Sequence, residues 1–122
     1  MQPTALIADD DTYTLFFMEQ ILQPAGMQVL RAEDGLQALE ILQEVVPSII
    51  FLDLLMPRLS GLDVINFIME NRLLRDVPVV IVTAHNRERF AQFPQVARAD
   101  AYLLKPIRPQ DIREFARQAA GR

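Results

Sequence analysis

The stretch that decides the fold is Ser48-Ile-Ile-Phe-Leu-Asp-Leu-Leu-Met-Pro57. Four apolar residues at positions 49–52 run directly into the carboxylate of Asp53. Prolines on either side limit the length of this segment, and its β-branched and aromatic residues favour a strand over a buried helix. A strand that is apolar on both faces is typical of the centre of a parallel sheet, because crossover helices cover both sides. Asp53 is then expected at the carboxyl edge of the sheet, where open α/β folds bind ligands.

The composition indicates one domain with a buried core. The chain has 122 residues, and 51% of them are hydrophobic, so we expect a single domain over residues 1–122 with no effector domain in this chain. No apolar run approaches the length of a membrane span, and the first three residues leave no room for a signal peptide. The absence of cysteine excludes a disulfide scaffold and thiolate metal sites, and is compatible with the expected location in the cytoplasm.

The charge distribution excludes two classes of partner. The formal net charge is −4, and the basic residues form no cluster, so neither nucleic acid nor an anionic membrane is expected as a direct partner. Lysine occurs once, at Lys105, and every other basic side chain apart from the single histidine is arginine.

Apolar runs and amphipathic segments alternate along the chain. Strands are predicted at 5–8, 27–32, 49–52, 77–82 and 101–104. Helices are predicted at 13–23, 35–46, 62–73 and from Pro109 onward, with a short or broken helix between 86 and 97 because Pro94 disrupts its interior. Five such alternations predict a flavodoxin-like, doubly wound, five-stranded parallel sheet in the order 2-1-3-4-5, with five helices.

The apolar positions of the helices predict which side chains enter the core. For the first three helices the predicted core positions are Phe17, Met18, Ile21, Leu22 and Ala25; then Leu36, Leu39, Leu42 and Val46; then Val64, Ile65, Ile68 and Met69. Phe16 falls almost opposite the first of these stripes.

Chemically informative residues follow the predicted strands: Asp9 and Asp10, Asp53, Thr83, and Lys105. Parallel strands have their carboxyl ends on one edge, so these side chains are expected to converge. Three neighbouring carboxylates repel one another, and Mg²⁺ suits such a site because it prefers oxygen ligands and keeps several waters. The metal and the ammonium group together favour an anion with several oxygens. The sequence therefore predicts a phosphoryl-transfer site with a nucleophilic aspartate, Asp53.

The same residues carry a family resemblance. The matching elements are the pair Asp9-Asp10 after an apolar strand, Asp53 in Asp-Leu-Leu-Met-Pro, Ser60-Gly61-Leu62, Thr83-Ala84, and Tyr102-Leu-Leu-Lys105-Pro106. In this order, over essentially the whole chain, they resemble the receiver domain of bacterial two-component response regulators.

The resemblance implies a phosphorylation site and a metal site. Asp53 would accept a phosphoryl group from a histidine kinase or a histidine phosphotransfer protein. Mg²⁺ would be bound by Asp10, Asp53 and the backbone carbonyl of Leu55, with Asp9 acting mainly through water. The chain would be a signalling phosphoacceptor rather than an enzyme, apart from self-catalysed phosphotransfer and autodephosphorylation.

The resemblance also implies a switch. Lys105 would pair with one phosphoryl oxygen, and Thr83 would bond to another and move towards it. Tyr102 would turn inward behind Thr83, and the peptide bond before Pro106 would be cis. The signal would pass to a downstream protein target or to an effector domain missing from this chain.

Alternatives remain open from the sequence. Asp9-Asp10-Asp11 alone is compatible with a helix-cap cluster. A flavin carrier would share the fold, but three acids after the first strand would repel its phosphate. The stronger alternative is a degenerate receiver that acts as a phosphorylation-independent interaction module. Arg98, where the family often has glycine, and Pro94 leave the output mechanism open.

Overall fold

Five short apolar segments pair side by side into one parallel sheet in the computed structural model, which describes residues 2–121. The strands are β1 (Thr4–Ala8), β2 (Gln28–Ala32), β3 (Ile49–Leu52), β4 (Val79–Thr83) and β5 (Ala101–Leu104). Their order is β2-β1-β3-β4-β5, and each neighbouring pair is parallel. The predicted fold class and strand order are confirmed.

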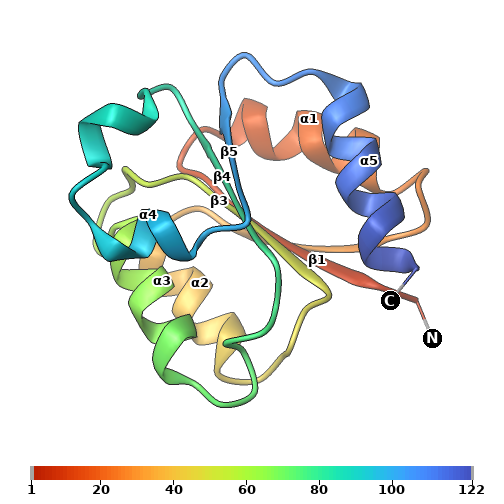
Figure 1. The fold of residues 1–122 in the computed structure, drawn as a ribbon. Coiled ribbons are helices and arrows are strands. Elements are labelled where there is room, and N and C mark those ends of the chain that lie inside the picture. Colours follow the sequence, from red (N-terminus) through yellow and green to blue (C-terminus); the bar gives the residue numbers. More distant parts are fainter. Residues whose placement is uncertain (1, 122) are drawn as a thin grey trace.

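Helices cover both faces of the sheet. They are α1 (Thr12–Leu22), α2 (Gly35–Leu42), α3 (Gly61–Glu70), α4 (Pro94–Arg98) and α5 (Pro109–Ala120), with a 3₁₀ turn, η1 (Arg87–Phe90), before α4. Figure 1 shows α1 and α5 on one face and α2, α3 and α4 on the other. The predicted interruption near Pro94 is confirmed, because this proline begins α4 at the one helical position where its missing N–H costs nothing. None of the helices formed by residues 2–121 is both long enough and apolar enough to cross a bilayer.

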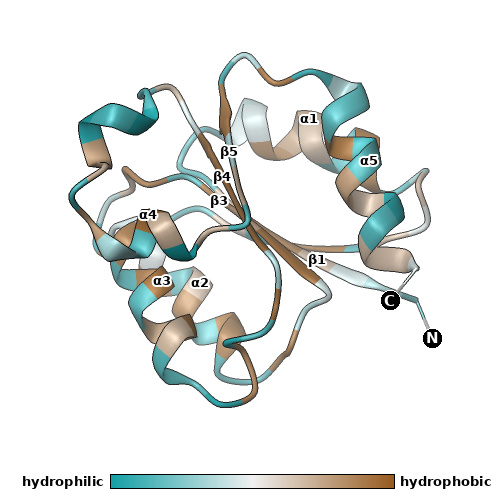
Figure 2. Ribbon diagram, in the orientation of Figure 1, coloured by the Kyte–Doolittle hydropathy of each residue, from teal (hydrophilic) through white to brown (hydrophobic). Residues whose placement is uncertain are grey.

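The core consists of two apolar layers, one on each side of the sheet. All four residues of β3 and all five of β4 are buried, as expected for central parallel strands. Figure 2 shows the hydrophobic colour concentrated along the strands and the hydrophilic colour on the outer helix surfaces. Phe51 of β3 packs edge-to-face on Phe115 of α5, with ring centroids 6.4 Å apart. Each fully buried side chain of this kind stabilises the fold by about 1.5–3 kcal/mol.

Carboxylates and a hydroxyl fix where three helices begin. Asp11 accepts the backbone N–H of Tyr13 at 3.0 Å and caps α1. Asp34 caps α2 in the same way, and Ser60 forms a reciprocal capping box with Asp63 at the start of α3. Each cap satisfies a backbone donor that the first helical turn leaves free, and is worth about 1 kcal/mol.

Several predicted core positions are wrong. Phe17, Val46 and Met69 have exposed fractions of 41%, 51% and 37%. The buried stripe of α1 is Leu15, Met18, Ile21 and Leu22. Phe17 therefore lies at the edge of this stripe, and Ala25 is exposed in the turn beyond the helix. Helix α2 ends at Leu42, four residues earlier than predicted, so Val46 lies outside it. Met69 is in the last turn of α3, which ends at Glu70 rather than residue 73.

Candidate functional site

The strand ends bring the predicted site residues to one edge of the sheet. Asp9, Asp53 and Lys105 directly follow β1, β3 and β5, and Thr83 closes β4. The sheet hydrogen bonding continues past the strand ends: Asp53 N–H donates to the Ala8 carbonyl at 3.0 Å, and Lys105 N–H donates to the Thr83 carbonyl at 2.8 Å. The backbones that carry these side chains are therefore held by the sheet itself.

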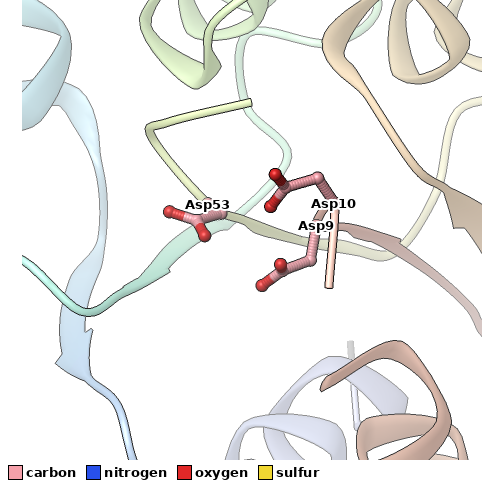
Figure 3. Close-up of side chains that lie close together, drawn as sticks. All are labelled: Asp9, Asp10 and Asp53. Atoms are coloured by element: carbon pink, nitrogen blue, oxygen red, sulfur yellow. The ribbon is translucent and has the colours of Figure 1, made fainter. Parts of the chain in front are cut away.

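Three carboxylates form the centre of the site. Asp9, Asp10 and Asp53 each offer an oxygen such that all three atoms lie within 4.8 Å of one another (Figure 3). Asp9 and Asp53 are buried, with exposed fractions of 3% and 6%, whereas Asp10 is exposed. Oxygens on opposite sides of one Mg²⁺ are about 4 Å apart. The spacing therefore fits a magnesium site that is open to water on the Asp10 side.

Lys105 forms ion pairs with two of these acids. Its Nζ lies 2.7 Å from Oδ2 of Asp9 and 3.1 Å from Oδ2 of Asp53. Burial opposes the charge of Lys105, but the hydrogen bond to Asp9 and the charges of both carboxylates outweigh it and raise the pKa of the ammonium. Burial raises the pKa of Asp9, more strongly than its hydrogen bond to Lys105 lowers it.

Backbone N–H groups orient the same two carboxylates. Asp9 Oδ1 accepts the N–H of Asp11 at 2.9 Å, and Asp53 Oδ1 accepts the N–H of Leu55 at 3.3 Å. Each acid thus bonds to its own chain two residues further on, a local turn that aspartate favours. One oxygen of each carboxylate is fixed by the backbone, and the other is held by Lys105.

Thr83 contributes a buried hydroxyl without a partner. The residue is fully buried, and Oγ1 makes no hydrogen bond within the described part of the chain. A buried polar atom left unpaired costs about 1–3 kcal/mol. The site therefore contains a hydroxyl that an incoming oxygen-rich group would satisfy.

Tyr102 is bonded to the loop that follows β4. Its hydroxyl donates to the backbone carbonyl of His85 at 2.6 Å, and the side chain is only partly buried. Burial, together with the negative charge of Asp53, raises the pKa of the phenol. Arg89 Nη1 lies 2.6 Å from Nδ1 of the His85 ring.

Two contacts at this edge were not expected from the sequence. Besides capping α2, Asp34 binds Arg58 through its Oδ2 at 2.8 Å. The sequence predicts that Lys105 opposes the acids as a group, but it does not single out Asp9 as the nearest partner of Lys105. No spacing rule links residues this far apart. The charged residues near the predicted strand ends are the one feature of the sequence that indicates such contacts. The cis peptide bond before Pro106 was predicted and is present.

Comparison with known proteins identifies the family. Residues 5–117 match the model of the response regulator receiver domain. The chain belongs to this family. The polar-differentiation response regulator DivK of Brucella ovis is 28% identical to this receiver domain over 107 residues, which cover 88% of this chain and 87% of that protein. DivK of Brucella anthropi matches to the same extent.

Solved structures give the same family and fold. A CheY-like response regulator receiver domain protein from Methanospirillum hungatei superposes with a TM-score of 0.88 at 26% identity, covering 99% of this chain and 95% of that one. The chemotaxis response regulator CheY4 of Vibrio cholerae has a TM-score of 0.86 at 23% identity, covering 98% and 99%, which shows the shared fold. This protein is thus a signalling domain whose acidic cluster is typical of the receiver family.

Proposed function

We propose that Asp53 is the phosphoacceptor of this receiver domain and takes a phosphoryl group from a phosphohistidine on a histidine kinase or a phosphotransfer protein. The observation that supports this most is the environment of its carboxylate. Asp53 is buried at the sheet edge, next to two further acids, and lies 3.1 Å from an ammonium group. An aspartate that only stabilised the fold would need the ammonium group alone, without two further acids beside it.

The transfer step follows from the positions of the side chains. A carboxylate oxygen of Asp53 forms a bond to phosphorus while the bond between phosphorus and the donor's imidazole nitrogen breaks, and the imidazole leaves with that electron pair. Lys105 balances the negative charge of the phosphoryl oxygens. The unpaired hydroxyl of Thr83 donates to one of them, which removes the cost of its burial.

The acidic residues fit a magnesium ion, which we propose as the cofactor. Asp10, Asp53 and the carbonyl of Leu55 would hold it, and Asp9, whose Oδ2 is the nearer partner of Lys105, would act mainly through water. When bound, the ion supplies positive charge that offsets the charge gathered during transfer. Asp9 and Lys105 hold the rest of the site in place.

The switch that we propose runs from Thr83 to Tyr102. Movement of Thr83 towards the phosphoryl group would displace the loop after β4, whose His85 carbonyl now accepts the Tyr102 hydroxyl. Loss of that bond frees Tyr102 to turn inward. The consequence is a changed contact surface around η1 and β5, which a downstream protein target or an effector domain would recognise.

The proposal also covers where this receiver domain acts and how it returns to its unphosphorylated state. Residues 1–122 would act as one receiver domain, without direct contact to nucleic acid or membrane. The absence of cysteine is compatible with the reducing cytoplasm that we propose as its location. Slow self-catalysed loss of the phosphoryl group would reset the domain. A degenerate, phosphorylation-independent module is not favoured, because no member of the expected set of acids, hydroxyl and lysine is missing.

The test is incubation with acetyl phosphate, with and without Mg²⁺, followed by phosphate-affinity electrophoresis. We expect a retarded band for wild type only when the metal is present, and none for Asp53→Asn. Equal retardation of wild type and Asp53→Asn would show that another residue is modified. No retardation of wild type at any magnesium concentration would favour the degenerate module.

A further inference from the structure

The loop from Asp53 to Ser60 carries the proposed metal ligand Leu55, and its first residues are firmly fixed. Leu54 is fully buried, and its carbonyl accepts the N–H of Gly61 at 2.8 Å. A Cβ at Gly61 would lie 2.2 Å from the Asp53 carbonyl oxygen, so the start of α3 packs directly on the backbone of Asp53. The end of the loop nearest Asp53 is therefore tightly packed against the start of α3.

The far side of Leu55 is fixed by a different contact. Arg58 places both Nε and Nη2 at 2.8 Å from Oδ2 of Asp34. Oδ1 of the same carboxylate accepts the N–H of Gln37 at 2.8 Å and caps α2. Asp34 is buried, and both of its oxygens are engaged. Asp34 is therefore a fixed contact point at the start of α2, outside the loop from Asp53 to Ser60.

Two backbone features bring the loop against the same helix. Arg58 has a φ of +69°, in the left-handed region that residues with a Cβ seldom adopt. A Cβ at Gly35, the first residue of α2, would lie 1.9 Å from the carbonyl oxygen of Leu59, so only glycine permits this approach. Glycine or asparagine would adopt the backbone angle at position 58 more easily than arginine. The guanidinium contact gives a reason for arginine there.

The Asp34 carboxylate is charged at neutral pH. The N–H of Gln37, and after it Arg58, lower its pKa. The contact with Arg58 is therefore an ion pair under ordinary conditions. Leu55 lies between two fixed points, buried Leu54 on one side and this ion pair on the other.

We propose that Arg58 is a positioning residue: by binding Asp34 it holds the loop so that the Leu55 carbonyl stays in place for the magnesium ion. The inference rests on the proposed function, because it assigns a consequence to the metal site. Arg58 touches neither the acids of the site nor the phosphoryl group. Its effect is transmitted through three residues of backbone.

The test measures Mg²⁺ affinity by isothermal titration calorimetry on the unphosphorylated protein, and stability by urea unfolding without metal. Arg58→Gln should weaken Mg²⁺ binding by about three- to tenfold, near the lower limit for residues behind a metal ligand. Asp34→Asn keeps the helix cap and should weaken binding equally. The double variant should be no worse than either single one, because both remove the same contact.

Two further variants separate positioning from general effects. Arg117→Gln removes the same charge from an exposed pair with Glu114 on α5 and should leave Mg²⁺ affinity within twofold of wild type. Arg58→Gly relieves the backbone angle, so it should unfold at a higher urea concentration than Arg58→Gln while binding Mg²⁺ equally weakly. If Arg58 only stabilised the fold, the urea concentration at unfolding and the Mg²⁺ affinity would fall together across the variants.

The outcomes distinguish this inference from the function on which it rests. Wild type that binds Mg²⁺ and is phosphorylated, with Arg58→Gln unchanged in Mg²⁺ affinity, would overturn the positioning role alone. Additive losses in the double variant would do the same. Wild type that binds no Mg²⁺ would overturn both proposals.

Discussion

The Nζ of Lys105 lies 2.7 Å from Oδ2 of Asp9, which is closer than the 3.1 Å to Asp53. The only lysine is therefore held mainly by Asp9 rather than by the proposed phosphoacceptor, Asp53. Asp9 keeps the ammonium at the site and leaves it able to turn towards a more highly charged partner. A phosphoryl group on Asp53 carries more negative charge than the carboxylate that it modifies, so Lys105 should shift towards it.

This geometry predicts that Lys105→Arg is not a conservative change. A planar guanidinium cannot occupy the same point between two carboxylates as a compact ammonium. We expect phosphorylation by acetyl phosphate to slow by about tenfold, less than the 10²–10³-fold loss when a preorganised donor is deleted. The measurement is the initial rate of phosphorylation at saturating Mg²⁺. A variant that is phosphorylated and switches like wild type would show that the shape of this cation does not matter.

The acidic cluster predicts that magnesium stabilises the folded protein. If Mg²⁺ binds the native cluster as proposed and little else, a concentration ten times its dissociation constant should add about 1.4 kcal/mol. Asp10→Asn removes one repelling charge, and should raise the melting temperature without metal by about 3–5 °C for each kcal/mol of repulsion relieved. Thermal unfolding with EDTA or with Mg²⁺ tests both. A wild-type melting temperature that millimolar Mg²⁺ leaves unchanged would contradict the proposed magnesium site.

The exposed face of α1 predicts a docking contact. Phe16 has an exposed fraction of 57% and lies on the side of α1 opposite its buried stripe, one turn after Thr12, where the helix begins. Exposed aromatic residues are frequent interface anchors, worth about 1–2 kcal/mol or more. Phe16→Ala should slow transfer from the cognate phosphodonor protein by about tenfold. Its reaction with acetyl phosphate is the control, because equal loss with both donors would indicate misfolding instead.

The lifetime of the phosphoryl group should depend on Leu55. Leu55 has an exposed fraction of 40% and lies two residues after Asp53, where we expect it to shield the phosphorus from water without offering a hydrogen bond. In Leu55→Asn an amide can orient an attacking water, and decay should quicken by roughly two- to tenfold, a small part of what full orientation supplies. The decay rate after removal of the donor is the readout. Unchanged decay would mean that Leu55 is not the shield.

The pH dependence of stability should report on Asp34. Its pKa is lowered by the Gln37 N–H and then by Arg58. A carboxyl with a lowered folded pKa contributes stability that is fully present above its unfolded pKa, near 3.9, and is lost as the pH falls through the folded value. Asp34→Asn should therefore be less stable than wild type at pH 7, and the difference should shrink below about pH 4. A difference that persists unchanged at pH 2 would assign it to packing instead.

The sequence predicted the sheet better than it predicted the helix ends. β3 and β5 have the predicted bounds. β3 is buried and apolar throughout, and in both strands a charged residue, Asp53 or Lys105, marks where the chain leaves the sheet. Helix α2 ends at Leu42 rather than at Pro47, because apolar residues such as Val46 also occur in exposed connections. Burial in such segments depends on tertiary packing rather than on spacing.

The contacts within the site were also predictable only in part. Strand topology predicted the meeting of Asp9, Asp10 and Asp53, because Asp9 and Asp53 directly follow two parallel strands and Asp10 is the next residue after Asp9. The contacts of Arg58 with Asp34, and of Tyr102 with the His85 carbonyl, join loops whose paths no periodicity describes. Such contacts become visible only when the three-dimensional positions of the side chains are known.

The most direct measurement of the central claim is to locate the phosphoryl group itself. Wild type is phosphorylated with acetyl phosphate and Mg²⁺, reduced with borohydride, which converts an aspartyl phosphate to homoserine, and digested for peptide mass spectrometry. The account predicts homoserine at position 53 in the metal-containing sample and unmodified Asp53 in the sample without metal. Homoserine at another aspartate, with Asp53 intact, would contradict it.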